Sequence, residues 1–181
     1  MNIAVYCAAS QSNCLTFDPK TEELGKWIAN MNHTLVYGGG NTGLMGVVAT
    51  SVMNAGGQVI GVMPQFFVDR EIAKEDITKL HIVETMTERK NKMIELSEVY
   101  IALPGGPGTL EEIAEVVSWV RVGQTNGISI FYNIEGYYNH LEAFFNHMVT
   151  TKLLSEEDRN QIYFAKSLEE IEKLLENYEK R

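Results

Sequence analysis

Short apolar segments rich in β-branched and aromatic residues alternate along this chain with longer segments of helical period. The short segments are typical of buried strands and the longer ones of amphipathic helices. We expect strands near residues 2–7, 34–37, 58–62, 80–84, 98–103, 128–132 and 162–164. We expect helices near residues 17–31, 43–55, 86–97, 110–122, 137–149 and 167–179.

This alternation predicts an α/β fold, namely a Rossmann-like three-layer sandwich with a mostly parallel central sheet of about seven strands. The chain has no Pro/Ser-rich linker and no charge block, so we expect a single domain over residues 1–181. The acidic run at residues 156–158 indicates a solvated helix start.

Two of the expected strands run into a glycine cluster that opens a helix. The first cluster occupies residues 38–46 (GGGNTGLMG) and the second residues 104–109 (PGGPGT). Because ligands of parallel sheets bind at the carboxyl ends of the strands, we expect both loops to face one crevice. Free amides at a helix N-terminus bind phosphate without a lysine. Tight turns alone remain the alternative for the first loop, whereas the glycine and proline content of the second favours phosphate binding.

The first cluster also fits the GxGxxG spacing through Gly38, Gly40 and Gly43. The second half of that fingerprint is missing, because the next expected strand ends in Met63-Pro64 with no acidic residue for a ribose hydroxyl. The sequence therefore disfavours NAD.

The overall charge narrows the class of partner. Fifteen Lys and Arg residues against 24 Asp and Glu residues give a formal net charge of −9. Nucleic acids and anionic membranes are bound mainly by pooled positive charge, so neither is expected as a partner. A small phosphorylated ligand is still compatible with this charge, because it needs only a few donors in one pocket.

The termini and cysteines indicate a cytoplasmic protein. The chain begins Met1-Asn2-Ile3 without a basic region, and no apolar stretch is long enough to span a bilayer. Cys7 lies in a run expected to be a buried strand, so we do not expect a disulfide with Cys14.

Glu112 has two possible roles. Thr109 and Glu112 have the spacing of a capping box, with Thr109 as the N-cap. A helical wheel places Glu112 nearly opposite the expected buried stripe, so it could instead face a crevice. That stripe consists of Leu110, Ile113, Ala114, Val117 and Val120.

Arg89 falls inside the apolar arc of the helix that Thr85 and Glu88 are expected to cap. A guanidinium near a core face is costly unless an anion pairs with it. We expect that anion to be a bound phosphate or an internal carboxylate such as Glu112. The alternative is an arginine that extends to solvent from the helix edge.

With these residues in place, the chain resembles a known family. Residues 104–112 (PGGPGTLEE) resemble the PGGxGTxxE signature of the LOG family, the cytokinin riboside 5′-monophosphate phosphoribohydrolases. The Arg89-Lys90 pair, the run at residues 38–46 and the pair Cys7 and Ser10 match the same family in order. The resemblance covers nearly the whole chain up to about residue 150 and thins beyond it. Ala8-Ala9 departs from the Gly-Ser that the family usually carries.

The resemblance implies a homodimer that hydrolyses AMP-like nucleotides to the free base and ribose 5-phosphate, with no metal or cofactor. It implies that Arg89 and Glu112 are catalytic, with Glu112 ionised by its place near a helix N-terminus. The residues that it implies for substrate binding are Ser10, Gly39, Gly40, Gly43, Met86, Lys90, Gly105, Gly106, Gly108 and Thr109.

Two other classes of protein remain open. One is a nucleotide-binding module without turnover. The other is a lysine decarboxylase, the name that proteins of this kind have carried. That chemistry uses pyridoxal phosphate on a lysine, typically next to a histidine, and none of the four histidines of this chain has a lysine beside it.

Overall fold

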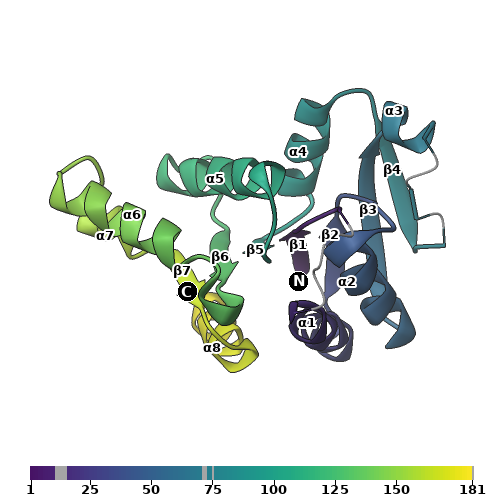
Figure 1. Cartoon of the computed structure of the whole chain (residues 1–181), viewed down its shortest axis with the longest axis horizontal. Coiled ribbons are helices and arrows are strands. Elements are labelled where there is room, and N and C mark those ends of the chain that lie inside the picture. Colours follow the sequence, from purple (N-terminus) through teal and green to yellow (C-terminus); the bar gives the residue numbers. More distant parts are fainter. Residues whose placement is uncertain (11–15, 71–72, 75, 181) are drawn as a thin grey trace.

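A computed structural model of the chain describes residues 1–10, 16–70, 73–74 and 76–180. Seven strands form one sheet in which every strand pair is parallel, in the order β4-β3-β2-β1-β5-β6-β7 (Figure 1). This arrangement confirms the expected sheet. The strands are β1 (Asn2–Tyr6), β2 (Thr34–Tyr37), β3 (Gln58–Pro64), β4 (Lys79–Val83), β5 (Val99–Ala102), β6 (Ile128–Tyr132) and β7 (Ile162–Ala165).

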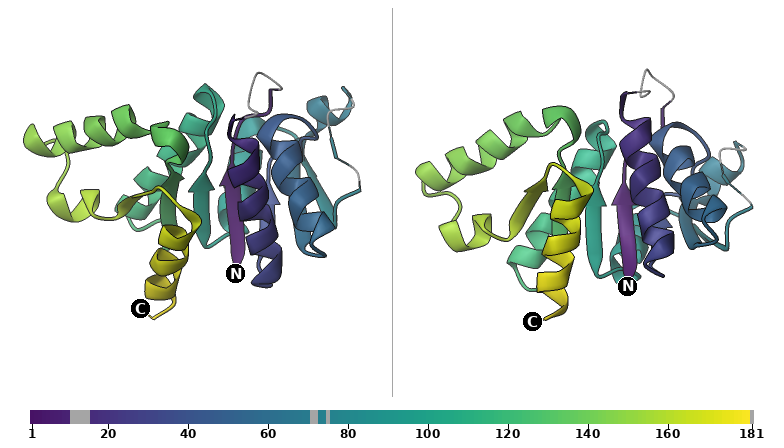
Figure 2. Two further views of the ribbon diagram at one scale, coloured as in Figure 1. Left: turned by 60° about the horizontal axis from the view of Figure 1, so that its bottom comes forward. Right: turned by 90° about the horizontal axis from the view of Figure 1, so that it is seen from below.

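Helices cover both faces of the sheet, which gives the expected three layers. Helices α1, α2 and α8 lie on one face and α4, α5 and α6 on the other (Figures 1 and 2). Their apolar side chains form a core cluster with each face of the sheet. The helices are α1 (Asp18–Asn30), α2 (Gly43–Asn54), α3 (Gln65–Val68), α4 (Met86–Glu95), α5 (Pro107–Arg121), α6 (Asn139–Thr150), α7 (Glu156–Arg159) and α8 (Leu168–Glu179), with a 3₁₀ turn η2 (Ile134–Gly136).

The double coverage explains the apolar runs in the sequence. Strands β5 and β6 are buried at every position. A parallel strand with helices on both faces has no solvent side, so it carries continuous apolar residues instead of an alternating pattern. The sequence pattern therefore located the strands to within one or two residues at each end.

The strand order also locates the binding region. From β1 the chain builds outward through β2, β3 and β4, and it then returns to the other side of β1 with β5. Adjacent strands whose connections leave in opposite directions open a crevice at their carboxyl ends. The second glycine cluster directly follows β5, so it lies at this point.

The largest error of the sequence interpretation concerns the start of α5. The helix begins at Pro107 and not at residue 110, because the fixed φ of proline suits the first helical turn. Gly106 is the N-cap and no side chain caps the helix, so Thr109 does not form the expected capping box. The expected stripe is wrong at one end: Leu110 is 44% exposed, whereas Ile113 is buried and Val117 and Val120 pack against the core as expected. Glu112 is buried as well.

The short helices α3 and α7 complete the fold. The sequence pattern did not predict α3, which is only four residues long. The prediction of a helix start at residues 156–158 is confirmed, since α7 begins at Glu156 and Ser155 caps it by accepting a hydrogen bond from the Asp158 amide.

Candidate active site

The Arg89 side chain extends from α4 toward the carboxyl end of β3 and is buried there. Its exposed fraction is 6%, and its Nε donates a hydrogen bond to the Val62 carbonyl at 3.2 Å. Its Nη2 lies 3.4 Å from Oε1 of Glu112 on α5. We expected this arginine to pair with a bound phosphate or an internal carboxylate, and the structure pairs it with the carboxylate of Glu112.

Gly38, which follows β2, provides the space that this guanidinium occupies. A Cβ added at Gly38 would overlap Nη2 of Arg89 and lie 2.9 Å from its Cζ. The sequence interpretation did not assign a role to Gly38 beyond the turn. Only the path of the Arg89 side chain across the end of β2 reveals this role.

Glu112 is buried to the same extent as Arg89, at 6% exposure. Burial raises the pKa of Glu112 above its ordinary value of 4.5, and the positive charge of Arg89 offsets part of that rise. We expected the helix N-terminus to favour ionisation. Because α5 begins at Pro107, Glu112 lies in the second turn, where the helix dipole is weak and desolvation outweighs it.

The second glycine loop opens onto the same side of α5. A Cβ added at Gly106 or at Gly108 would meet no atom within 4 Å, so both residues border open space. Gly105 differs, because a Cβ there would overlap the Thr109 side chain. The amides of a first helical turn have no partner within the helix. The loop therefore offers the amides of Gly108 and Thr109, with the helix dipole behind them, to an anion.

These groups share one cavity of about 320 Å³, which we call the Arg89 cleft. It contains seven of the predicted site residues: Ser10, Met86, Arg89, Gly106, Gly108, Thr109 and Glu112. The other residues that line it are Cys7, Ala8, Ala9, Met45 and Glu111. Cys7 is buried, as expected, and Cys14 lies outside the described residues.

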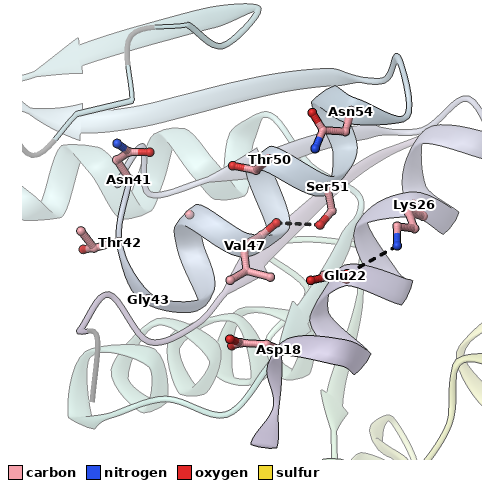
Figure 3. A pocket seen from close by; sticks show the side chains of 11 residues that line it. Asp18, Glu22, Lys26, Asn41, Thr42, Gly43, Val47, Thr50, Ser51 and Asn54 are labelled. Atoms are coloured by element: carbon pink, nitrogen blue, oxygen red, sulfur yellow. Dashed lines mark hydrogen bonds and ion pairs between the residues drawn. The ribbon is translucent and has the colours of Figure 1, made fainter. Parts of the chain in front are cut away.

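The glycines predicted from the first loop do not line the Arg89 cleft. The Gly39 carbonyl accepts a hydrogen bond from the Lys74 amide at 2.9 Å, and Gly40 pairs with Ala73 in an isolated bridge. Gly43 instead borders a cavity of about 650 Å³ between α1 and α2, together with side chains such as Thr42 and Glu22 (Figure 3). The role of Gly39, Gly40 and Gly43 in substrate binding stays a prediction.

The N-terminus of α2 is occupied by the chain that follows β1. The Met45 amide donates to the Ala8 carbonyl at 3.3 Å, and the Thr42 hydroxyl donates to the Ala9 carbonyl at 2.6 Å. A Cβ at Gly43, whose φ is +59°, would lie 2.7 Å from the carbonyl oxygens of Ala8 and Ser10. The first loop thus uses Gly43 for close packing of backbone, which corresponds to the tight-turn alternative for that loop.

Lys90 also lies outside the lining of the Arg89 cleft. Its Nζ is 2.8 Å from Glu111 and 3.1 Å from Glu115, so it joins α4 to α5. The hydrogen bond to Glu111 raises the pKa of Lys90. Arg89 and Glu112 occupy the same two helices, so this bridge joins the helices that carry the buried Arg89–Glu112 pair. A direct contact of Lys90 with substrate stays a prediction.

Two negative findings apply to the described part of the chain. Residues 1–10, 16–70, 73–74 and 76–180 contain no group of three or more His, Cys, Asp or Glu side chains placed to hold a metal ion. Over the same residues, no helix has the length and apolar character needed to cross a membrane.

The fold and the cleft define a class of protein. An amide-lined glycine loop and a buried Arg–Glu pair at the strand-order reversal of a parallel sheet are typical of an α/β enzyme that acts on a phosphorylated small molecule. Comparison with known proteins identifies the family within this class.

A family model described as "Possible lysine decarboxylase" matches residues 45–175. The chain is 40% identical over 176 residues to cytokinin riboside 5′-monophosphate phosphoribohydrolase LOG1 of Arabidopsis thaliana. The aligned residues cover 97% of this chain and 83% of that protein. It is 36% identical to the LOG enzyme of Oryza sativa subsp. japonica over 97% of this chain and 73% of that one. The chain therefore belongs to the LOG family, and the match extends past residue 150, the point after which we expected the similarity to thin.

Solved structures of lower identity share the fold. The molybdenum cofactor carrier protein of Chlamydomonas reinhardtii superposes with a TM-score of 0.77 at 20% identity, over 99% of this chain and 98% of that one. The molybdenum cofactor binding protein of Rippkaea orientalis gives a TM-score of 0.70 at 22% identity, over 97% and 95%. At these identities the likeness concerns the fold alone.

Proposed function

We propose that this protein hydrolyses the N-glycosidic bond of a nucleoside 5′-monophosphate, AMP or an N6-modified AMP, to the free base and ribose 5-phosphate. The observation that carries the proposal is the position of the buried Arg89–Glu112 pair beside the open glycines of the second loop, in one cleft. The names of relatives such as LOG1 of Arabidopsis thaliana support the same reaction.

The reaction divides the groups of the cleft between binding and chemistry. The amides of Gly108 and Thr109 hold the 5′-phosphate at the N-terminus of α5. As the N-glycosidic bond breaks, its electron pair leaves with the base, and positive charge builds up on the sugar ring. Water then bonds to the anomeric carbon, and a water proton goes to the base.

Glu112 supplies the negative charge that this transition state requires. A carboxylate in a buried site stabilises a developing cation more strongly than one in water, and it can also orient the attacking water. Arg89 fixes the position of that carboxylate through the 3.4 Å contact and contributes its own charge to the phosphate or the sugar hydroxyls. Glu112 and Arg89 are therefore the residues proposed as catalytic.

The proposal is tested by incubating the protein with AMP and with isopentenyl-AMP and following release of the base by chromatography. Cleavage of either nucleotide supports it, and the ratio of the two kcat/KM values identifies the preferred base. Release of no base from either nucleotide would refute the proposal and favour the non-catalytic binding module. Among the described residues lining the Arg89 cleft there is no lysine, so the cleft offers no group for the Schiff base of a decarboxylase.

The raised pKa of Glu112 predicts an acidic limit to activity. If the carboxylate is the active form, kcat at saturating AMP is full above the pKa of Glu112 and falls as the pH drops through it. Because burial raises this pKa above 4.5, the fall begins at a higher pH than an exposed glutamate would give. A kcat that stays constant down to about pH 4.5, with circular dichroism showing a folded protein, would contradict this role of Glu112.

We further propose that the protein is a homodimer in which a second copy covers the apolar surface between α5 and α6. Leu110, Phe144 and Leu153 are 44%, 54% and 76% exposed there, around a cavity of about 380 Å³. Exposed apolar patches of this kind mark interfaces. In sedimentation, the wild type is expected to have twice the chain mass of 20.4 kDa. The variant Phe144→Glu is expected to have the mass of a single chain. A monomeric wild type would exclude the dimer.

A further inference from the structure

The turn between β6 and α6 is fixed by its own side chains. Asn133 accepts a hydrogen bond from the Tyr138 amide at 2.7 Å and donates one from Nδ2 to Asn139 at 2.8 Å. Its own amide donates to the Ala165 carbonyl of β7 at 2.7 Å. Residues 133–139 therefore form a rigid support beside the second glycine loop, far from it in sequence.

This support directs two tyrosine hydroxyls onto the backbone of the second glycine loop. Tyr137 Oη donates to the Gly105 carbonyl at 2.6 Å, and Tyr138 Oη donates to the Leu103 carbonyl at 2.6 Å. Tyr138 is buried, whereas Tyr137 is 46% exposed. The Tyr137 ring packs edge to face on Phe17 and on Tyr138, with centroids 5.7 and 5.0 Å apart. Neither the Arg89–Glu112 pair nor the chemistry proposed above uses these contacts.

With these contacts, four successive carbonyl groups of the loop accept hydrogen bonds. Between the two that the tyrosines hold, the Pro104 carbonyl accepts from the Ala8 amide at 3.2 Å. The next carbonyl, that of Gly106, accepts from the Leu110 amide at 3.1 Å. Carbonyl oxygens carry partial negative charge, so any of them turned into the Arg89 cleft would repel a phosphate. Tyr138, Ala8 and Tyr137 hold the first three of these carbonyls to other segments, and Leu110 holds the Gly106 carbonyl within the first turn of α5.

The hydrogen bond from Tyr137 to the Gly105 carbonyl also fixes the direction of the Gly106 amide. The Gly105 carbonyl and the Gly106 N–H belong to one planar trans peptide, so they point in opposite directions. When Tyr137 fixes the carbonyl on its own side, the Gly106 N–H is directed away from Tyr137. Gly106 lines the Arg89 cleft and Gly105 does not. Without the hydroxyl, a peptide between two glycines can rotate easily, because neither residue restricts its backbone through a side chain.

We propose that Tyr137 is a positioning residue for phosphate binding: its hydroxyl holds the Gly105–Gly106 peptide in the orientation that presents the Gly106 amide to the anion. This inference rests on the proposed function, since it assumes that the second glycine loop receives the 5′-phosphate. Tyr137 does not touch the substrate and acts only through the loop.

The variant Tyr137→Phe removes the hydroxyl and keeps the ring contacts with Phe17 and Tyr138. The dissociation constant of inorganic phosphate, measured by calorimetry, is expected to rise roughly threefold to tenfold, the effect of one hydrogen bond. KM for AMP is expected to rise by the same factor, with kcat nearly unchanged, because phosphate binding is equal in the ground and transition states. In nuclear magnetic resonance spectra, the Gly106 amide is expected to shift on phosphate addition in the wild type and to shift less in the variant.

Tyr178→Phe is the matched control, because Tyr178 Oη also donates to a loop carbonyl, that of Asn126 at 3.1 Å, next to the amino end of β6. It is expected to leave both constants unchanged. Equal phosphate affinity in Tyr137→Phe and the wild type, or a fall in kcat without a rise in KM, would overturn the positioning role. Absence of phosphate binding by the wild type would overturn it too. Phosphate binding without AMP cleavage would refute the proposed function alone, and the comparison of the two tyrosine variants would still decide the role of Tyr137.

Discussion

Replacement of Glu112 by Gln is expected to lower kcat for AMP cleavage by a factor of about 10² to 10³, the usual effect of removing one preorganised charge from a transition state. Gln keeps the size of the side chain and can still place an oxygen beside the guanidinium of Arg89. It lacks the negative charge that stabilises the positive sugar ring. The affinity for AMP, measured by calorimetry, is expected to change little, because the ground state carries no positive charge at that position.

Glu142 on α6 offers a matched control outside the Arg89 cleft. Glu142 of α6 pairs with Arg159 at 3.3 Å, close to the 3.4 Å that separates Glu112 from Arg89, but it lies outside the Arg89 cleft. Glu142→Gln removes the same charge from an ion pair of similar length but greater exposure, and it is expected to keep its kcat. If Glu112→Gln cleaves AMP at the rate of the wild type, Glu112 is not the catalytic carboxylate. If it changes the affinity alone, a binding module without turnover is the better description.

The substitution Gly38→Ala is expected to lower kcat/KM for AMP by on the order of 10²-fold, although Gly38 does not line the Arg89 cleft. The added methyl would overlap Nη2 of Arg89, and the flexible guanidinium must then move out of contact with Glu112. The backbone is not strained, since Gly38 is not among the glycines with positive φ. We therefore expect a folded protein with a melting temperature near that of the wild type and a misplaced arginine.

A double-mutant cycle separates this mechanism from a general disturbance of the loop. If Gly38→Ala acts through Arg89, then adding it to Arg89→Met should reduce activity no further, because the arginine is already absent. Additive losses in kcat/KM would show that Gly38 acts by another route. A Gly38→Ala variant with wild-type activity would show that the arginine tolerates displacement.

Much of the fold could be predicted because strands with helices on both faces appear in the sequence as continuous apolar runs. β5 and β6 are continuous apolar runs, and the helices between strands have a clear period, so tertiary contacts reinforce the local pattern. The start of α5 could not be predicted in the same way. Pro107 is compatible both with a turn and with a first helical position, and only the packed structure decides between them.

The error at α5 changed the interpretation of the site. A helix starting at residue 110 makes Thr109 a cap, whereas the helix starts at Pro107 and Thr109 lies inside it. The helical wheel counted Leu110 as buried and placed Glu112 opposite the core, whereas Leu110 is exposed and Glu112 is buried. The prediction for Arg89 was better, because the cost of an unpaired guanidinium on an apolar face depends little on where the helix begins. That cost identified Glu112 as a candidate partner before its orientation was known.

Other parts of the site depend on contacts between distant segments and left no signal in the sequence. The fit of Arg89 beneath Gly38 joins residues 51 positions apart, and the contact of Tyr137 with Gly105 joins residues 32 positions apart. A glycine or a tyrosine alone does not indicate such a partner. The GxGxxG spacing does not distinguish a ligand site from close packing, which is the use that the structure shows for Gly38 and Gly43.

The tethered carbonyls of the second glycine loop have a consequence for selectivity. A loop that is ordered only by its ligand loses conformational entropy at the moment of association, and its affinity is weaker by that amount. Here the ordering takes place during folding, before any nucleotide arrives. If the loop binds the phosphate as proposed, it is equally ready for every 5′-phosphate ester, and discrimination between one nucleotide and another is left to the surfaces that meet the base.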